Sequence, residues 1–282
     1  MLNKLNSLDR RWIFLAITAA VVIPILFPLG LPIKISQQTR QFYNRIEKLP
    51  QGAIVCMSFD YGPGTRVECH PMAQAALYHL FTRRCRVIAV ALWPEGALFA
   101  REALREAARE TGAVDGVDYV NLGYKAGGEV VLRGAGDDLR AFFPNDIDGR
   151  SWDDLPLLQK VKGWNSVDLI CAWSMGKPGV LEYVRVVGGS YHRPIITGTT
   201  AVTAPEAMPL LNSGQIEGIL QGMRGASEYE TLLERPGSAV RGMDALSMAH
   251  LAIAAFIVMA NVIYWLNKRR SGRSSAADGG AQ

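Results

Sequence analysis

Eight polar side chains stand where buried strands are predicted to end, and together they could bind and act on a small ligand. In an open parallel sheet the ligand crevice lies beyond the carboxyl ends of the strands, so residues that follow buried strands are the first candidates. These residues are Asp60, Glu68, His70, Trp93, Lys125, Ser174, Thr199 and Thr200. The loops of any such fold are polar, however, and the sequence leaves open whether this rim binds a ligand.

One motif has the spacing of a catalytic nucleophile. Residues 172–176 read AWSMG, an A-x-S-x-G sequence between a predicted strand and a predicted helix. This motif resembles the nucleophile elbow of α/β-hydrolases, where a tight turn exposes a serine hydroxyl, and the resemblance implies Ser174 as the nucleophile. The family also needs an acid and then a histidine downstream, but only His192 and His250 follow Ser174. His192 is about one helix away and His250 lies in an apolar segment, so the chain order argues against a triad.

The sequence predicts no metal, cofactor or nucleic-acid site. Asp60, Glu68 and His70 could hold a metal only if the loop after the first strand folded back. No two of the four cysteines have the two-residue spacing of a zinc site, although a disulfide between Cys69 and Cys85 stays open. No GxxxxGK[ST] or GxGxxG motif is present, and the basic residues of the central region are dispersed.

The central region, residues 34–244, alternates strand-like and helix-like segments. Continuous apolar runs predict buried strands, and segments with helical spacing lie between them. The predicted strands are 53–59, 87–93, 118–124, 129–133, 167–174 and 194–200. This alternation predicts an α/β fold, a Rossmann-like and mostly parallel sheet with helices on both faces. A turn-rich stretch at 134–166 predicts short helices or an ordered excursion, and residues 204–237 read as helical, either as one helix with a glycine face or as two short helices.

Two apolar segments flank this domain. Residues 12–33 and 245–266 contain no charged side chain, and at a rise of about 1.5 Å per residue each can cross a hydrocarbon core of about 30 Å. Prolines crowd the second half of the first segment, so its helix should kink or end early. Seven basic residues lie on the tails 1–11 and 267–282, against five beside the segments on the domain side. The charge difference predicts cytoplasmic tails, the second of them disordered, and an extracytoplasmic domain.

The second apolar segment carries a polar face. Ser247, His250, Ala254 and Asn261 are separated by three, four and seven residues, which places them along one side of a helix. Polar groups in lipid require partners, so this face predicts a packing seam against the first segment or another membrane subunit. The alternative is that His250 lies at the membrane interface and is hydrated.

The composition narrows the function classes. With 282 residues, 49% hydrophobic and 20% charged, the chain is neither a disordered tail, a collagen-like fibre nor a small disulfide scaffold. No motif identifies a family. We therefore expect a bacterial two-pass inner-membrane protein that acts as a non-enzymatic accessory subunit, with the bilayer and other integral membrane subunits or a second copy as partners. The alternatives are a membrane-anchored serine hydrolase using Ser174 and a small-solute binding protein.

Overall fold

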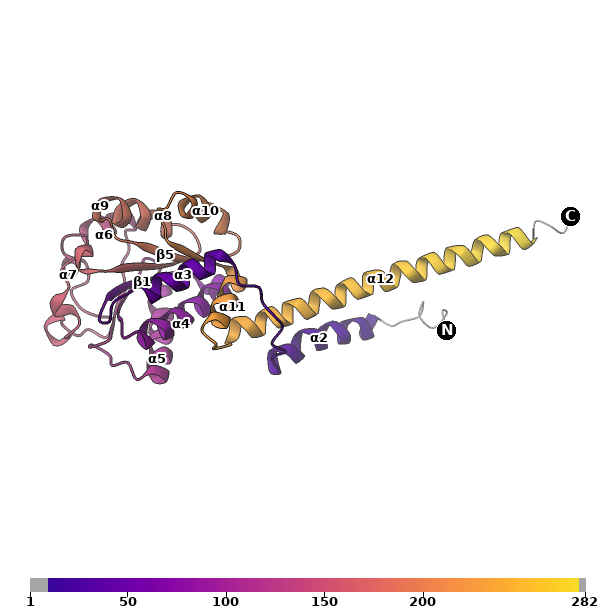
Figure 1. Ribbon diagram of the computed structural model, residues 1–282, viewed down its shortest axis with the longest axis horizontal. Coiled ribbons are helices and arrows are strands. Elements are labelled where there is room, and N and C mark those ends of the chain that lie inside the picture. The colour runs from indigo at the N-terminus through magenta and orange to yellow at the C-terminus, as the bar shows by residue number, and fades with distance from the viewer. Residues whose placement is uncertain (1–9, 279–282) are drawn as a thin grey trace. The chain divides into compact units, whose positions relative to one another are not determined.

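A computed structural model of the protein describes residues 10–278, and two compact units are distinguished in it, residues 32–240 and the flanking segments. The first unit is an α/β domain with a six-stranded, entirely parallel sheet in the order β3-β2-β1-β4-β5-β6 (Figure 1). This is the order of a doubly wound Rossmann-like sheet. The strands are β1 (Ile54–Asp60), β2 (Arg86–Ala91), β3 (Tyr119–Tyr124), β4 (Leu169–Ser174), β5 (Ile195–Thr199) and β6 (Gly218–Gln221).

Helices cover both faces of this sheet, as the alternation predicts (Figure 1). On one face lie α3 (Gln37–Glu47), α4 (Arg66–Thr82), α5 (Gly96–Thr111) and α11 (Gly222–Leu232). On the other lie α6 (Glu129–Gly134), α7 (Leu139–Phe142), α8 (Val180–Tyr183), α9 (Gly189–Tyr191) and α10 (Ala204–Asn212). A π-helical stretch, Val184–Gly188, joins α8 to α9, and the turn-rich stretch forms α7 and short 3-10 helices.

The central strand β1 shows why a parallel sheet forms here. Every one of its residues is buried, because both faces of the sheet are covered. Val55, Met57 and Phe59 enter one core, and Cys56 enters the other. Helix α5 approaches β1 so closely that a Cβ on Gly96 would lie 1.8 Å from the Phe59 carbonyl oxygen.

Two predicted elements are wrong. Residues 129–133, predicted as a strand, belong to α6, where Val131 and Leu132 are buried and Val130 is exposed, a helical rather than an alternating pattern. The strand at 194–200 is not the last, because β6 follows it. The segment predicted as helical after this strand contains β6 instead. Its regularly spaced glycines suggest a helical face, but Gly214 adopts a left-handed φ of +76° in a turn and Gly218 packs against the backbone of Phe42.

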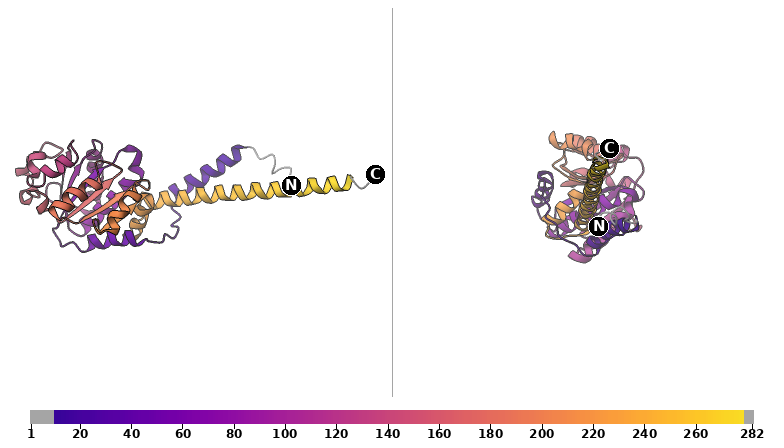
Figure 2. Two further views of the ribbon diagram at one scale, coloured as in Figure 1. Left: turned by 90° about the horizontal axis from the view of Figure 1, so that it is seen from above. Right: turned by 90° about the vertical axis from the view of Figure 1, so that its right-hand side faces the viewer.

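The flanking segments differ from their predicted bounds. The first forms α2 (Arg10–Leu26), which contains Pro24 and ends before residue 33, as the prolines predict. The second lies within α12 (Ser238–Asp278), one continuous helix that runs on through the part of the tail predicted as disordered (Figure 2). By length and composition the Ser238–Leu266 part of α12 can cross a membrane, whereas α2 is a shorter apolar helix. Residues 1–9 and 279–282 lie outside the described residues.

One buried carboxylate joins the two flanking segments. Asp244 of α12 accepts hydrogen bonds from the backbone N–H groups of Leu29, Gly30 and Leu31 at 2.9, 3.0 and 3.2 Å. The segment that follows α2 is therefore held to α12 within this unit. The predicted seam of α12, Ser247, His250, Ala254 and Asn261, is exposed along the described chain.

Candidate functional site

A row of polar side chains crosses the carboxyl edge of the sheet. Asp60 of β1 pairs in register with Ser174 of β4, Ser174 pairs with Thr199 of β5, and Thr199 pairs with Gln221 of β6. Residues in register on adjacent strands point to the same face, so these four side chains form one continuous row. The row runs across the β1–β4 junction, where the strand order reverses and doubly wound sheets bind ligands.

Asp60 is the ionisable member of this row, and it is fully buried. Its carboxylate accepts hydrogen bonds from the Ser58 hydroxyl at 2.6 Å and from the Leu92 backbone N–H at 2.7 Å. Burial raises the pKa of Asp60 from 3.8 to about 7, and the nearby charge of Glu182 adds to this, while the two hydrogen bonds act against it. Asp60 is therefore poised to change its protonation state near neutral pH.

The hydroxyls beside Asp60 are also buried. Ser174 is 2% exposed and its Oγ donates to the Gly176 carbonyl oxygen at 3.1 Å. Thr199 is 1% exposed, and its Oγ1 has no hydrogen-bond partner among the residues that the structure describes. An unsatisfied buried hydroxyl costs free energy, so a partner for Thr199 Oγ1 would stabilise this end of β5.

The loops after β1 and β4 meet above the row. Met175 joins them, because its sulfur accepts hydrogen bonds from the Gly62 N–H at 3.1 Å and the Thr65 hydroxyl at 3.2 Å. The Trp93 indole N–H donates to the Pro178 carbonyl oxygen at 2.9 Å, which ties the loop after β2 to the loop after β4. Three successive loops of the central strands are thus fixed relative to one another.

Two glycines in these loops have no explanation within the protein. Gly64 and Gly176 lack a left-handed φ, and a Cβ built on either would meet nothing within 4 Å. Every other glycine whose surroundings the structure describes either has a left-handed φ or would place its Cβ within 4 Å of another atom. Neither backbone conformation nor packing therefore requires glycine at positions 64 and 176, whereas close approach of a ligand to the backbone would.

The remaining predicted crevice residues lie in three places. Glu68, near the start of α4, accepts a hydrogen bond from the Ala201 N–H at 2.8 Å, beside Thr200, which bonds to Thr203. Lys125 follows β3 and is partly exposed at the same edge. Glu68, Thr200 and Lys125 thus surround the row without belonging to it.

His70 is directed away from the row. It lies on the opposite face of the sheet, where its Nδ1 is 2.8 Å from the Tyr61 hydroxyl. Burial lowers the pKa of His70 to about 4, and the charge of Arg66 lowers it further, while Glu102 opposes this. The imidazole is therefore neutral at physiological pH. Among the described residues, no three His, Cys, Asp or Glu side chains could together hold a metal ion.

Sequence reasoning missed Gln221, Gly64 and Gly176. Gln221 was hidden because β6 was read as helix. Gly64 and Gly176 end the tripeptides GPG and SMG, which follow buried strands, and this position is visible in the sequence. The sequence does not show, however, that a side chain at either position would meet only open space.

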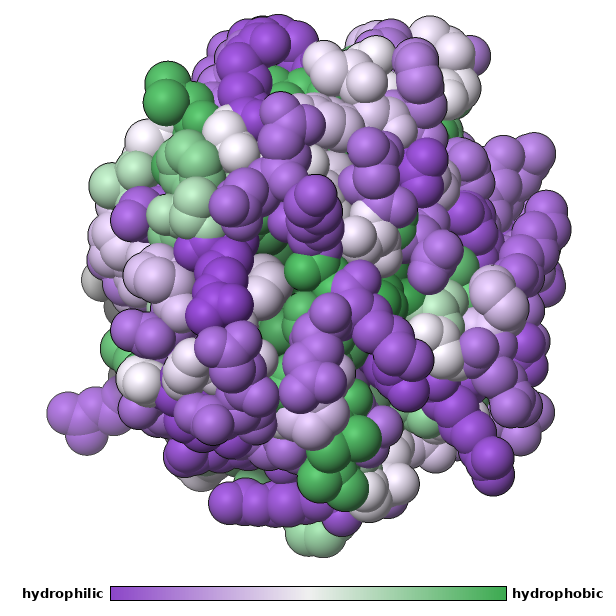
Figure 3. Space-filling view, turned by 90° about the vertical axis from the view of Figure 1, so that its left-hand side faces the viewer, coloured by the Kyte–Doolittle hydropathy of each residue, from purple (hydrophilic) through white to green (hydrophobic). Residues whose placement is uncertain are grey.

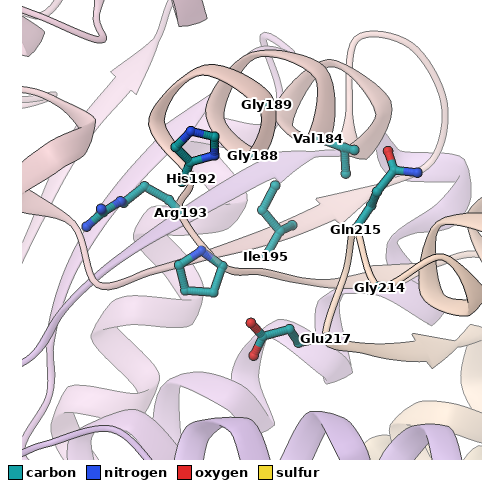
Figure 4. Close-up of a pocket in the computed structure, with 10 residues that line it drawn as sticks. Val184, Gly188, Gly189, His192, Arg193, Ile195, Gly214, Gln215 and Glu217 are labelled. Atoms are coloured by element: carbon teal, nitrogen blue, oxygen red, sulfur yellow. The ribbon is translucent and has the colours of Figure 1, made fainter.

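A cavity of about 380 Å³ lies at the opposite, amino edge of the sheet, beside the start of β5 (Figure 4). His192 and Arg193 lie on one side of Ile195, and Gln215 and Glu217 lie on the other. Among the sequence-predicted residues, His192 alone lines this cavity, far along the chain from Ser174. The four cysteines are buried and free, so Cys69 and Cys85 are not bridged.

Comparison with known proteins gives similar solved structures only. No family model matches the chain, and no curated protein matches it. The chain is similar to AibC, with 12% identity, a TM-score of 0.29, and coverage of 80% of this chain and 48% of AibC. It is similar to the C-terminal domain of the glycosyl transferase group 1 family protein LpcC from Francisella tularensis, with 12% identity, a TM-score of 0.33, and coverage of 80% and 97%. It is also similar to the trehalose-6-phosphate synthase OtsA, with 13% identity, a TM-score of 0.30, and coverage of 88% and 48%.

These comparisons overturn the expected function. The prediction of a non-enzymatic accessory subunit is wrong: the similar structures are named as a glycosyl transferase and a trehalose-6-phosphate synthase, and none is named as an accessory subunit. The chain spans about half the length of AibC and OtsA, and at these TM-scores the likeness assigns no reaction to it.

The geometry of the site also removes the serine hydrolase alternative. The Ser174 hydroxyl bonds to a backbone carbonyl rather than to a histidine, and His70 and His192 lie elsewhere. The A-x-S-x-G spacing therefore reflects a tight strand-to-helix turn without a triad.

Proposed function

We propose that the α/β domain is an enzyme that acts on a phosphorylated substrate at the carboxyl edge of the sheet. The observation that carries this proposal is the pair Gly64 and Gly176, which leaves two stretches of bare backbone on either side of the β1–β4 junction. Glycine at such positions lets a ligand phosphate approach the backbone N–H groups.

The surroundings favour an anion. Gly64 lies within a short 3-10 helix, Pro63–Thr65, which leads directly into the 17-residue helix α4. The N-terminus of α4 carries partial positive charge. Lys177 follows Gly176 and is exposed, and Lys125 is partly exposed at the same edge. Both ammonium groups are free to turn toward a phosphate, which supports anion binding rather than binding of a neutral solute.

The row below the loops supplies groups for proton transfer. Asp60, with its pKa of about 7, has the acidity of a group that exchanges protons near neutral pH. Because Asp60 is fully buried, it would act through the neighbouring hydroxyls of Ser174 and Thr199 rather than by touching the substrate. This arrangement supports a reaction in which a proton moves as a group leaves or joins the phosphorylated substrate.

Calorimetry on the full-length protein in mild detergent tests the proposal, with inorganic pyrophosphate and UDP-glucose as probes. We expect binding to weaken at least about tenfold in Gly64→Ala and Gly176→Ala, while the melting temperature stays within about 2 °C of wild type because each methyl group enters open space. Gly189→Ala, in helix α9 at the amino edge with its nearest atom at 3.7 Å, is the matched control. The proposal is refuted if neither probe binds, or if the glycine variants bind the probes as tightly as the wild type does.

We also propose that α12 anchors the enzyme in a bacterial inner membrane, with α2 as a second crossing and both tails in the cytoplasm. The apolar Ser238–Leu266 part of α12 and the hydrogen bonds that the segment after α2 donates to Asp244 support a helical hairpin. The exposed seam of α12 would then contact a neighbouring membrane helix. Labelling of single cysteines placed in each tail and in the domain, in intact cells, tests this topology: labelling of either tail from outside would contradict it.

A further inference from the structure

The exposed apolar side chains of the α/β domain gather at its carboxyl edge. Seven large hydrophobic residues between positions 32 and 240 are exposed, and five of them follow the carboxyl ends of strands. We call these five the apolar rim; they are Val67, Leu98, Tyr124, Val130 and Val202, between 41% and 86% exposed. The other two, Val114 and Val117, precede β3 at the amino edge. Single exposed apolar residues are common, but five at one edge call for an occupant.

Three of the five rim residues follow adjacent strands of the sheet. Val67 follows β1, Leu98 follows β2, and Tyr124 ends β3, and these are three adjacent strands about 4.8 Å apart. The Arg66 guanidinium lies 5.2 Å from the centre of the Phe99 ring, which confirms that the starts of α4 and α5 are neighbours. Exposed apolar residues thus follow three neighbouring strands along one half of the edge, with the exposed Arg66–Glu102 ion pair between the starts of α4 and α5.

The opposite end of the domain has a different surface. The face over α7 and α9, on the amino-edge side, is mostly hydrophilic, with several separate apolar groups among the polar ones (Figure 3). The apolar character of the carboxyl edge is therefore a local feature and does not reflect a generally apolar surface.

We propose that the substrate is a phosphorylated lipid, whose phosphate lies against Gly64 and Gly176 and whose apolar chain lies along the rim. This inference rests on the proposed function and names its substrate class. A water-soluble phosphorylated substrate accounts for the glycines and the basic side chains but leaves the rim uncovered. A lipid phosphate matches both, and the membrane anchor proposed above for α12 would place the domain where such lipids are found.

Binding to full-length protein in phosphatidylcholine nanodiscs tests the inference, with empty nanodiscs as the blank. The probes are farnesyl phosphate, which joins an apolar chain to a phosphate, inorganic pyrophosphate, which lacks the chain, and farnesol, which lacks the phosphate. We expect farnesyl phosphate to bind at least about tenfold more tightly than either of the other two.

Variants separate the two ends of the ligand. Leu98→Ser with Val130→Ser should weaken farnesyl phosphate binding at least about tenfold and leave pyrophosphate binding unchanged, since both side chains are exposed and contribute little to the fold. Val114→Ser with Val117→Ser makes the same kind of change at the amino edge and should alter neither.

The outcomes distinguish the two proposals. If pyrophosphate binds and the glycine variants block it, but farnesyl phosphate binds no more tightly, the lipid inference is wrong and the phosphate site stands. If farnesol binds as well as farnesyl phosphate, or the rim and control variants behave alike, the rim is not a lipid site. If no phosphorylated probe binds, both proposals fail.

Discussion

Replacing Asp60 by asparagine should change how the stability of the domain depends on pH. The folded protein holds the Asp60 proton up to about pH 7, whereas the unfolded chain releases it near pH 3.8. Between these values the folded state binds more protons, so the free energy of unfolding falls as pH rises. The full difference corresponds to about 4 kcal/mol at 1.36 kcal/mol per pKa unit, and about 3 kcal/mol of it lies between pH 5 and pH 8.5.

His70 acts in the opposite direction and hides part of this effect in the wild type. Its pKa of about 4 in the folded state, against 6.5 when unfolded, makes the free energy of unfolding rise between those pH values. Below pH 6.5 the contributions of Asp60 and His70 therefore oppose each other. In Asp60→Asn the rise from His70, about 2 kcal/mol between pH 5 and pH 6.5, is no longer opposed by Asp60.

Urea unfolding of the full-length protein in mild detergent, followed by tryptophan fluorescence from pH 5 to pH 8.5, measures this difference. We expect the stability of Asp60→Asn relative to wild type to increase by about 3 kcal/mol across this range, whatever fixed cost the buried amide adds. Ser58→Ala removes a hydrogen bond that lowers the pKa of Asp60, so it should move the wild-type decline to higher pH. A relative stability that is constant within about 0.5 kcal/mol would refute titration of Asp60 near neutral pH.

Three further substitutions or measurements check the packing. Glu228→Ala should destabilise the domain by about 2–4 kcal/mol in urea unfolding, because the buried carboxylate accepts hydrogen bonds from the N–H and hydroxyl of Ser36. Glu217→Ala removes an exposed carboxylate and should cost less than about 1 kcal/mol. Equal losses in the two variants would contradict the burial and bonding of Glu228. Gly96→Ala should lower expression of folded protein severely, since its Cβ would overlap a β1 carbonyl; a melting temperature like that of wild type would show that the α5–β1 approach is wrong. The four cysteines are buried and free, so they should react with a thiol reagent only after unfolding, and a mass lower by two hydrogens would reveal a disulfide instead.

The sequence predicts the frame of the domain because burial leaves a continuous pattern. Strands β1, β2, β4 and β5 are apolar runs bounded by turn residues, and the structure places each within two residues of its predicted bounds. The edge strand β6 has only four residues and begins with glycine, so neither length nor composition separates it from the helices around it. Its presence depends on α3 packing against it, a tertiary contact that no local pattern records.

The candidate site was predictable only in part for a similar reason. Position after a strand identifies Asp60, Ser174 and Thr199, and the register of three adjacent strands aligns them. Position alone cannot tell which face of the sheet a residue enters, so His70 was grouped with residues on the other side of the sheet. Nor can it show that two glycines border empty space, since that depends on loops far apart in the chain.

The cost of Asp60 itself argues for a role beyond folding. A neutral residue could occupy position 60. Above pH 7 it would avoid a loss of up to about 4 kcal/mol in the free energy of unfolding, which is a large share of the stability of a typical domain. The hydrogen bonds from Ser58 and Leu92 reduce this cost without removing it, because the pKa of Asp60 stays raised. Costly buried ionisable groups concentrate at functional sites, and this one lies at the strand-order reversal, in register with two buried hydroxyls and below two unexplained glycines. The buried ionisable group, the aligned hydroxyls and the two glycines are the features expected of the proposed enzyme, which would bind phosphate above the row and move a proton along it.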